Sequence, residues 1–192
     1  MRKLALALFT VLGFAGTATA STITYQAIMS GPNEATPNAS PGVGYALITI
    51  DDVLNTMTLD VTFSGLTGTT TASHIHCCTA VAGTGAAGVA TTTPTFAGFP
   101  LGVTSGTYFQ TLDLTAASSY NPAFVTAHGG VPGAEAFLLS GIASGQSYLN
   151  IHSSTFGGGE IRGFLTPVPE PATLTLFGFG LAAIARRRMR KS

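Results

Sequence analysis

The sequence predicts a mostly β domain with one or two short helices. Its most regular segment, residues 56–63, alternates apolar and polar side chains, which is the period of a strand with one buried face. The apolar positions are Met57, Leu59, Val61 and Phe63. The chain also contains 24 glycines together with many threonines and serines. This composition suits short strands joined by turns and is poor in helix-forming residues.

Six further strands are expected where polar and apolar residues alternate or β-branched and aromatic residues gather. They are residues 22–29, 43–50, the stretch around His74, 107–114, 147–152 and 160–165. The last two are expected to form a closing hairpin around the glycines at 157–159. Residues 30–42 contain three prolines and are expected to form a loop.

Helices are expected only between the fifth and sixth strands. Residues 122–127 begin with a proline, and residues 133–142 carry apolar side chains near helical spacing. Residues 79–106 are rich in Gly, Ala and Thr and are expected to form a long connection with at most one short strand. Connections of this length in a small domain are usually functional or mobile.

The N-terminal end has the order of a secretory signal peptide. Two basic residues precede an apolar run, residues 4–15, and small residues follow up to Ala20 and Ser21. This order predicts a signal peptide over residues 1–20 that is cleaved between Ala20 and Ser21. An uncleaved anchor is the alternative, but the apolar run is shorter than the ~20 residues of a membrane span.

The C-terminal end has the pattern of a second targeting signal. Pro169, Glu170 and Pro171 precede an apolar run, residues 172–185, and five basic residues follow within 186–191. The run is short for a transmembrane helix, but arginine side chains can extend to the lipid headgroups, so we expect it to span the membrane. The basic tail is expected on the cytoplasmic side.

This order of motif, apolar helix and arginines resembles the PEP-CTERM sorting signal of Gram-negative bacteria. The resemblance implies an inner-membrane intermediate, processing by an exosortase, and a final place on the cell surface or outside the cell. A simple C-terminal anchor uses the same physics and stays an alternative. The expected organisation is therefore a signal peptide at 1–20, one domain at 21–166 and the sorting signal at 167–192.

Charge is distributed unevenly along the chain. The chain has eight acidic and eight basic residues, but seven of the basic ones lie in the first three or the last seven positions. Arg162 is thus the sole basic residue of the domain at 21–166. An acidic domain with one arginine excludes nucleic-acid binding, which needs several Lys and Arg residues to neutralise phosphates.

Two short segments contain the candidate residues for a metal site or a buried polar cluster. Strand alternation places His74 and His76 on one face, and His152 lies on a second strand followed by Glu160 and Arg162. If the two strands are neighbours, three imidazoles with a carboxylate or a thiolate can hold zinc or copper. The alternative is a buried polar cluster without metal, in which Glu160 pairs with Arg162 or a histidine.

Cys77 and Cys78 are adjacent and directly follow the first histidine pair. They cannot link distant parts of the fold. In an oxidising compartment they can form a vicinal disulfide, bond to another chain, or bind a soft metal as thiolates. We therefore include both cysteines among the candidate metal ligands.

Four segments together resemble the CHRD domain, first described in chordin. They are residues 72–76 (ASHIH), 121–124 (NPAF), 148–152 (YLNIH) and 159–163 (GEIRG). The resemblance spans about residues 22–165 and implies an immunoglobulin-like antiparallel β-sandwich or barrel in an exported protein. Cys77 and Cys78 stand where the family commonly has a glycine-containing turn, so a role for this loop does not transfer.

The sequence gives no sign of an enzyme. It has no Ser-His-Asp order, phosphate-binding glycine loop or Cys-His nucleophile pattern, and four histidines are too few for a copper–zinc superoxide dismutase. We expect a non-enzymatic surface, extracellular-matrix or biofilm protein that binds exopolysaccharide or another surface protein. The alternative is a copper- or zinc-binding protein that uses the His/Cys cluster.

Overall fold

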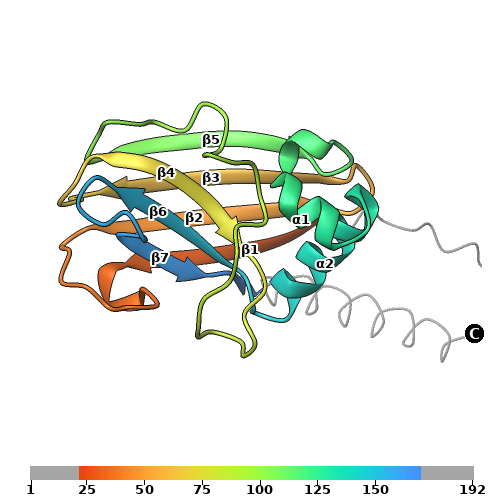
Figure 1. Cartoon of the computed structure of the whole chain (residues 1–192), viewed down its shortest axis with the longest axis horizontal. Helices are drawn as coiled ribbons and strands as arrows, with labels where there is room; N and C mark the ends of the chain where they lie inside the picture. Colours follow the sequence, from red (N-terminus) through yellow and green to blue (C-terminus); the bar gives the residue numbers. More distant parts are fainter. Residues whose placement is uncertain (1–21, 170–192) are drawn as a thin grey trace, which may run out of the picture.

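The computed structural model describes residues 22–169. Eight strands form one antiparallel sheet in the order β4-β6-β7-β1-β2-β3-β5, and β8 pairs with β1 (Figure 1). The strands are β1 Thr22–Ser30, β2 Val43–Asp51, β3 Thr56–Ser64, β4 Thr70–His76, β5 Gly106–Asp113, β6 Tyr148–Ser153, β7 Ile161–Phe164 and β8 Thr166–Pro167. The helices are α1 Pro122–Ala127 and α2 Val131–Ala143, with short 3-10 turns at Gly31–Asn33 and Ala117–Ser119.

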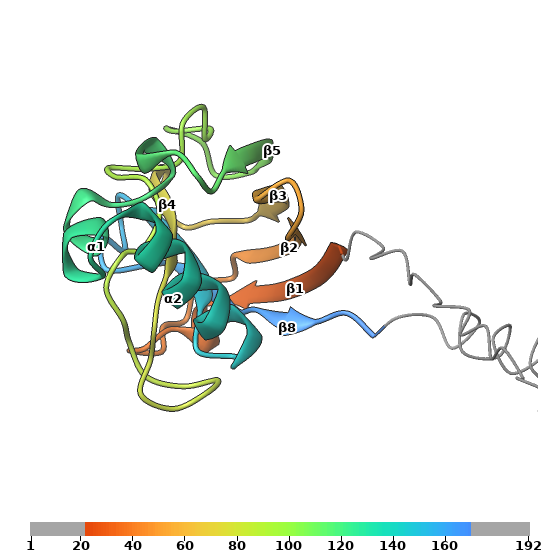
Figure 2. The same cartoon turned by 90° about the vertical axis from the view of Figure 1, so that its right-hand side faces the viewer.

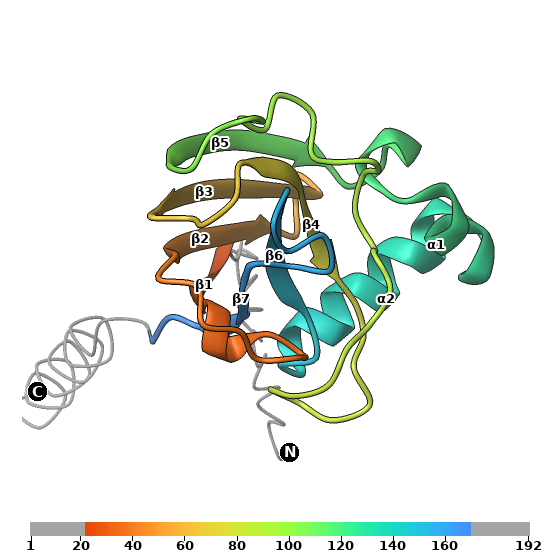
Figure 3. The same cartoon turned by 60° about the vertical axis from the view of Figure 1, so that its left-hand side comes forward.

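The predicted mostly β fold with short helices is confirmed. The predicted strands are present, and where both ends were predicted they differ from the observed ends by at most one residue. The sheet curls into a half-barrel, so its β4-β6-β7 part and its β1-β2-β3-β5 part enclose one core (Figure 3). β8 was not predicted, because two exposed residues give no periodic signal.

Helix α2 packs against the open side of the curled sheet (Figure 2). Its side chains Ala134, Leu138 and Ile142 are fully buried and belong to the same core as the strands. Residues four apart lie on one helix face, so this row forms the apolar stripe that the sheet needs as a cover. Within residues 22–169 no helix is long and apolar enough to span a membrane. The predicted cleavage site and the predicted span at 172–185 lie outside the described residues.

The long connection at 79–106 covers the free edge of β4. The backbone N–H groups of Ala90 and Phe96 donate to the carbonyls of Ile75 (3.0 Å) and Ser73 (3.2 Å). In return, the backbone N–H groups of Ser73 and Ile75 each donate to a threonine hydroxyl of the connection at 2.9 Å. An edge strand whose donors and acceptors are paired is held in one place. This connection contains only isolated bridges and no extended strand.

Glu160 does not pair with Arg162 or with a histidine, so that expectation is wrong. Strand β7 begins only at Ile161, and the alternation inferred from the sequence does not extend back to Glu160. The Glu160 carboxylate is fully buried and accepts hydrogen bonds from the Ser40 hydroxyl (2.5 Å) and from loop amides. These amides belong to Thr67 and Gly68.

The Glu160 carboxylate therefore ties three distant segments together. Burial alone would raise the pKa of Glu160, but hydrogen bonds from serine hydroxyls and the two amides outweigh burial and lower it. The ionised carboxylate is thus the form that the fold stabilises.

We expect Glu160→Gln to lower the free energy of unfolding by about 2–3 kcal/mol, because a charged acceptor shared by several donors is lost. Urea denaturation at neutral pH measures this loss. Asp60→Asn is the matched control, since Asp60 is exposed on β3, and its effect should stay within about 0.5 kcal/mol. Equal losses in the two variants would show that Glu160 has no such structural role.

Candidate metal centre

Three histidine side chains gather on one face of the neighbouring strands β4 and β6. The register pairs Ala72 with His152 and His74 with Asn150, which places His74, His76 and His152 on the same face. The ring centroids of His74 and His152 are 5.2 Å apart, and His76 lies 5.8 and 5.9 Å from the other two rings. One ring nitrogen from each histidine lies within 4.8 Å of the other two. The structure thus brings together three of the predicted site residues.

A backbone carbonyl orients each of the three rings. The pairs are His74 Nε2 with Pro94 O at 2.6 Å, His76 Nδ1 with Ala87 O at 2.9 Å, and His152 Nδ1 with Gly157 O at 3.0 Å. A carbonyl oxygen only accepts, so the ring nitrogen that faces it must carry the proton. In a neutral imidazole the other nitrogen then presents a lone pair.

The three remaining nitrogens have no hydrogen-bond partner. They are His74 Nδ1, His76 Nε2 and His152 Nε2, and all three are buried. They cannot bond to one another, because in the neutral rings none of them carries a proton. Buried polar atoms without partners are rare in folded proteins. Three converging lone pairs form a site that is complementary to a cation.

The environment keeps these imidazoles neutral. Burial lowers the pKa of all three histidines, and that of His76 falls to about 4. The neighbouring imidazoles lower the pKa of His74 and His76 further, because two positive rings would repel each other. Neutral imidazole is the form that binds transition metals.

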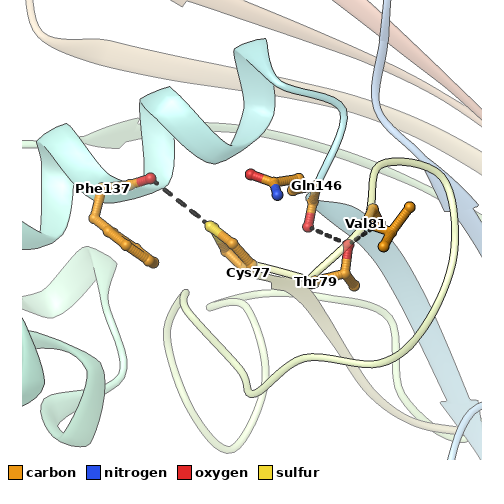
Figure 4. Close-up of a disulfide and its surroundings, with 6 residues drawn as sticks. Cys77, Thr79, Val81, Phe137 and Gln146 are labelled. Atoms are coloured by element: carbon orange, nitrogen blue, oxygen red, sulfur yellow. Dashed lines mark hydrogen bonds between the residues drawn. A yellow bond between two sulfur atoms is a disulfide. The ribbon is translucent and has the colours of Figure 1, made fainter.

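Cys77 and Cys78 do not join the histidine cluster. They are bonded to each other as a vicinal disulfide, which was one of the three predicted options. The sulfur of Cys77 lies 4.0 Å from the carbonyl oxygen of Phe137 on α2 (Figure 4), and that of Cys78 lies 3.8 Å from the same oxygen. A Cβ atom at Gly141 would collide with both sulfurs. The disulfide therefore packs against α2, while the neighbouring His76 lies in the cluster.

His128 does not belong to the cluster and lies at the end of α1. Its ring stacks on Phe137 at 3.9 Å between centroids and contacts Phe124 at 4.4 Å. It caps the helix through its backbone N–H, which donates to the carbonyl of Phe124. Its position supports packing of α1 on α2.

Sequence reasoning named Arg162 but missed Tyr148 and Glu34, which lie beside the cluster and Arg162. The Tyr148 ring stacks on His76 with a centroid distance of 4.8 Å and an interplanar angle of 5°. The guanidinium of Arg162 lies over the same Tyr148 ring, 4.7 Å from its centroid. Arg162 is 3.9 Å from Glu34, its carboxylate partner in the described residues. Glu34 lies in a proline-rich loop with no motif, but a sole arginine on a buried strand face does require a carboxylate or carbonyls.

The fold and the site define a mostly β domain with a buried three-histidine cluster on one sheet face. The chain belongs to the CHRD domain family, whose model matches residues 25–165. The model of the PEP-CTERM protein-sorting motif matches residues 167–191. The comparisons with curated proteins and with solved structures found no match.

These matches confirm both resemblances seen in the sequence. A PEP-CTERM motif marks a protein for export, for a membrane-anchored intermediate and for processing by an exosortase. Neither the CHRD domain nor the sorting motif is an enzymatic family.

The low pKa of His76 predicts a pH-dependent loss of stability in the metal-free protein. The folded pKa is about 4 and the ordinary value is 6.5, so between these values the unfolded chain binds more protons at His76. Stability is therefore full above about pH 6.5 and falls as the pH drops towards 4. We expect wild type to lose up to about 3 kcal/mol relative to His76→Gln over this range.

Urea denaturation of both proteins in the presence of a chelator measures this difference. Comparison with the variant cancels other titrating groups, such as Glu34, whose pKa burial raises to about 7 and which acts in the opposite direction. Parallel pH profiles for the two proteins would contradict a neutral, buried His76.

Proposed function

We propose that this protein is an exported, non-enzymatic surface protein that holds a copper or zinc ion at His74, His76 and His152. One observation carries the proposal: three imidazoles, each with a buried nitrogen that has no hydrogen-bond partner, gather so that one ring nitrogen of each lies within 4.8 Å of the other two. A polar cluster without metal would be expected to pair these nitrogens with donors. The described residues supply none.

The chemistry of the donors favours copper or zinc. Imidazole nitrogen suits both ions, whereas magnesium and calcium prefer oxygen ligands. In a tetrahedral zinc site the nitrogens lie about 2.0–2.1 Å from the ion, and hence roughly 3.3 Å from one another. The separation of up to 4.8 Å in the structure exceeds this value, so the rings would have to move towards a bound ion.

The surroundings of the rings support the same function. Each ring donates its other N–H group to a backbone carbonyl, and this arrangement fixes tautomer and orientation in metal sites. Stacking of Tyr148 holds the His76 ring from one side. The site is thus oriented before an ion arrives.

The sorting signal supports a role outside the cytoplasm. A metal-binding domain processed by an exosortase would act at the cell surface or in the extracellular matrix. A protein or exopolysaccharide partner stays a prediction of the sequence. The cysteines are not proposed as ligands, because their sulfurs are bonded to each other and face α2.

Metal should stabilise the protein through this site. We expect wild type stripped with a chelator to regain stability when Zn²⁺ or Cu²⁺ is added, by about 2.7 kcal/mol at a hundredfold excess over the dissociation constant. His152→Ala should abolish the response, because it removes one of three ligands. His128→Ala is the matched control and should respond like wild type.

Thermal unfolding with and without metal, together with metal analysis of protein purified from the periplasm, measures the effect. Without a metal role, His152→Ala would cost on the order of 1–3 kcal/mol and chelation would change nothing. That result would support the alternative interpretation of the site, a buried polar cluster without metal. A larger loss in His128→Ala would show that the site is elsewhere.

The sorting signal should be separable from the folded domain. We expect Glu170→Gln, or deletion of residues 186–191, to impair processing and surface delivery while the domain keeps its thermal stability. Cell fractionation and thermal unfolding of the two variants measure these effects separately. Parallel losses of sorting and stability would contradict the separation, and a mature wild-type protein that stays in the cytoplasm would contradict export.

A further inference from the structure

The two end strands of the curled sheet differ in how the rest of the chain covers them. Strand β4 ends the sheet on one side, and the connection at 79–106 pairs with its free edge. Strand β5 ends the sheet on the other side (Figure 1) and pairs with β3 alone. Among residues 22–169, no segment other than β3 exchanges a backbone hydrogen bond with residues 107–112. Strand β5 is therefore an open edge strand.

The pairing of β5 with β3 determines which of its backbone groups are free. The N–H group of Leu114 donates to the carbonyl of Asn55 at 2.8 Å, and this pair continues the β3–β5 register. In an antiparallel pair, residues bonded to the neighbouring strand alternate with residues whose N–H and C=O groups point away from it. The even-numbered residues of β5 therefore bond to β3. Three odd-numbered residues point to the open side: Thr107, Phe109 and Thr111.

Strand β5 lacks the features that prevent edge strands from pairing. Folded proteins protect such edges with Lys, Pro or β-bulges. β5 contains neither residue, its register with β3 has no shift, and its one charged residue is Asp113 at the end. Phe109 at its centre is 70% exposed, more than any other large apolar side chain in the described part of the chain. This combination indicates that a further strand covers the edge.

The free groups of β5 match those of a second copy of the same strand. Two β5 strands can run antiparallel about a twofold axis at Phe109, which then lies opposite its own copy, while Thr107 lies opposite Thr111. Every residue in this register meets one whose N–H and C=O groups also point to the open side. Three such pairs provide about six backbone hydrogen bonds, two for each pair.

The side chains are also compatible with this register. The two Phe109 rings form a cross-strand aromatic pair, which stabilises neighbouring strands. Asp113 lies opposite the residue that precedes β5 in the other copy, so no two charges face each other. The Thr111 carbonyl accepts from the Gln110 side chain of its own strand at 3.3 Å, and a backbone N–H of the second copy would replace this donor.

We propose that two copies of this protein associate through β5 and form one continuous antiparallel sheet. Because the β4 edge is covered, each copy has one open edge, and the association closes at a dimer without growing into a filament. The contact involves a single pair of strands, which is small for a protein interface, so we expect a dissociation constant in the micromolar range. The inference is independent of the proposed metal site on β4 and β6.

Analytical ultracentrifugation of protein purified from the periplasm measures the association. We expect a concentration-dependent equilibrium between monomer and dimer for the wild type. Phe109→Lys removes the aromatic pair and places two like charges at the axis, so the dissociation constant should rise by about tenfold or more. Ile28→Lys is the matched control, because Ile28 is 67% exposed on the same face but lies on β1 between other strands. This variant should dimerise like wild type.

Thr107→Pro tests the backbone pairing without adding a charge. Proline has no N–H group, and at position 107 that group points to the open side, so the hydrogen bonds to β3 are kept. Each copy loses one hydrogen bond of the dimer, and the dissociation constant should rise about tenfold.

Hydrogen exchange of the wild-type backbone amides locates the interface. The N–H groups of Thr107, Phe109 and Thr111 should exchange more slowly at high protein concentration than at low concentration. Those of Tyr108 and Gln110 are bonded to β3 in the monomer, so their exchange should not depend on concentration.

Several results would overturn the proposal. A wild type that stays monomeric well above micromolar concentration would show that β5 does not pair with a second copy. A dimer that is unaffected by both β5 substitutions, or that leaves exchange of the three odd-numbered amides unchanged, would place the interface elsewhere. Species larger than a dimer would contradict closure at one edge. Should a variant not fold, the exchange measurement on the wild type decides.

Discussion

The antiparallel register of β4 and β6 is the constraint on which the rest of the site depends. It places Ala72 opposite His152 and His74 opposite Asn150, so imidazoles from two strands share one face. A slip of one residue would turn this face into the core and expose Ile75, Leu149 and Ile151 in its place. Those three side chains are fully buried, so the same apolar contacts that build the core also fix the histidines.

Loop carbonyls orient the histidine rings that the strands position. The rings are oriented by carbonyls of Ala87, Pro94 and Gly157, all of which lie outside named strands. The connection that supplies the first two also pairs with the free edge of β4, so one segment stabilises the edge and aligns two of the histidine rings. A rigid sheet that carries the side chains and irregular segments that set their orientation is a common division of roles in binding sites.

The sequence predicted the strands well because alternation is local and strong from 22 to 64, and it predicted the histidine face because His74 and His76 are two residues apart. Sequence-based prediction failed for contacts between residues that lie far apart along the chain. Glu34 reaches Asn150 from a loop more than a hundred positions earlier, and Glu160 turns towards Ser40 because β7 starts one residue later than expected. The cysteines were grouped with the histidines by proximity in sequence, but β4 ends at His76 and the chain beyond it places both sulfurs against α2.

The scarcity of positive charge in the folded domain has a consequence for how ions reach it. Without Glu170 and the seven basic residues near the ends, seven acidic residues and Arg162 remain between positions 22 and 169. A domain of this sign concentrates cations of every kind near its surface, over a distance that shrinks to about 10 Å at 0.1 M salt. Abundant hard ions such as Mg²⁺ are gathered too but find no oxygen cage at the imidazoles. Under the proposed function, accumulation of cations by the outer charge and discrimination by the buried nitrogens are therefore the work of separate parts of the domain.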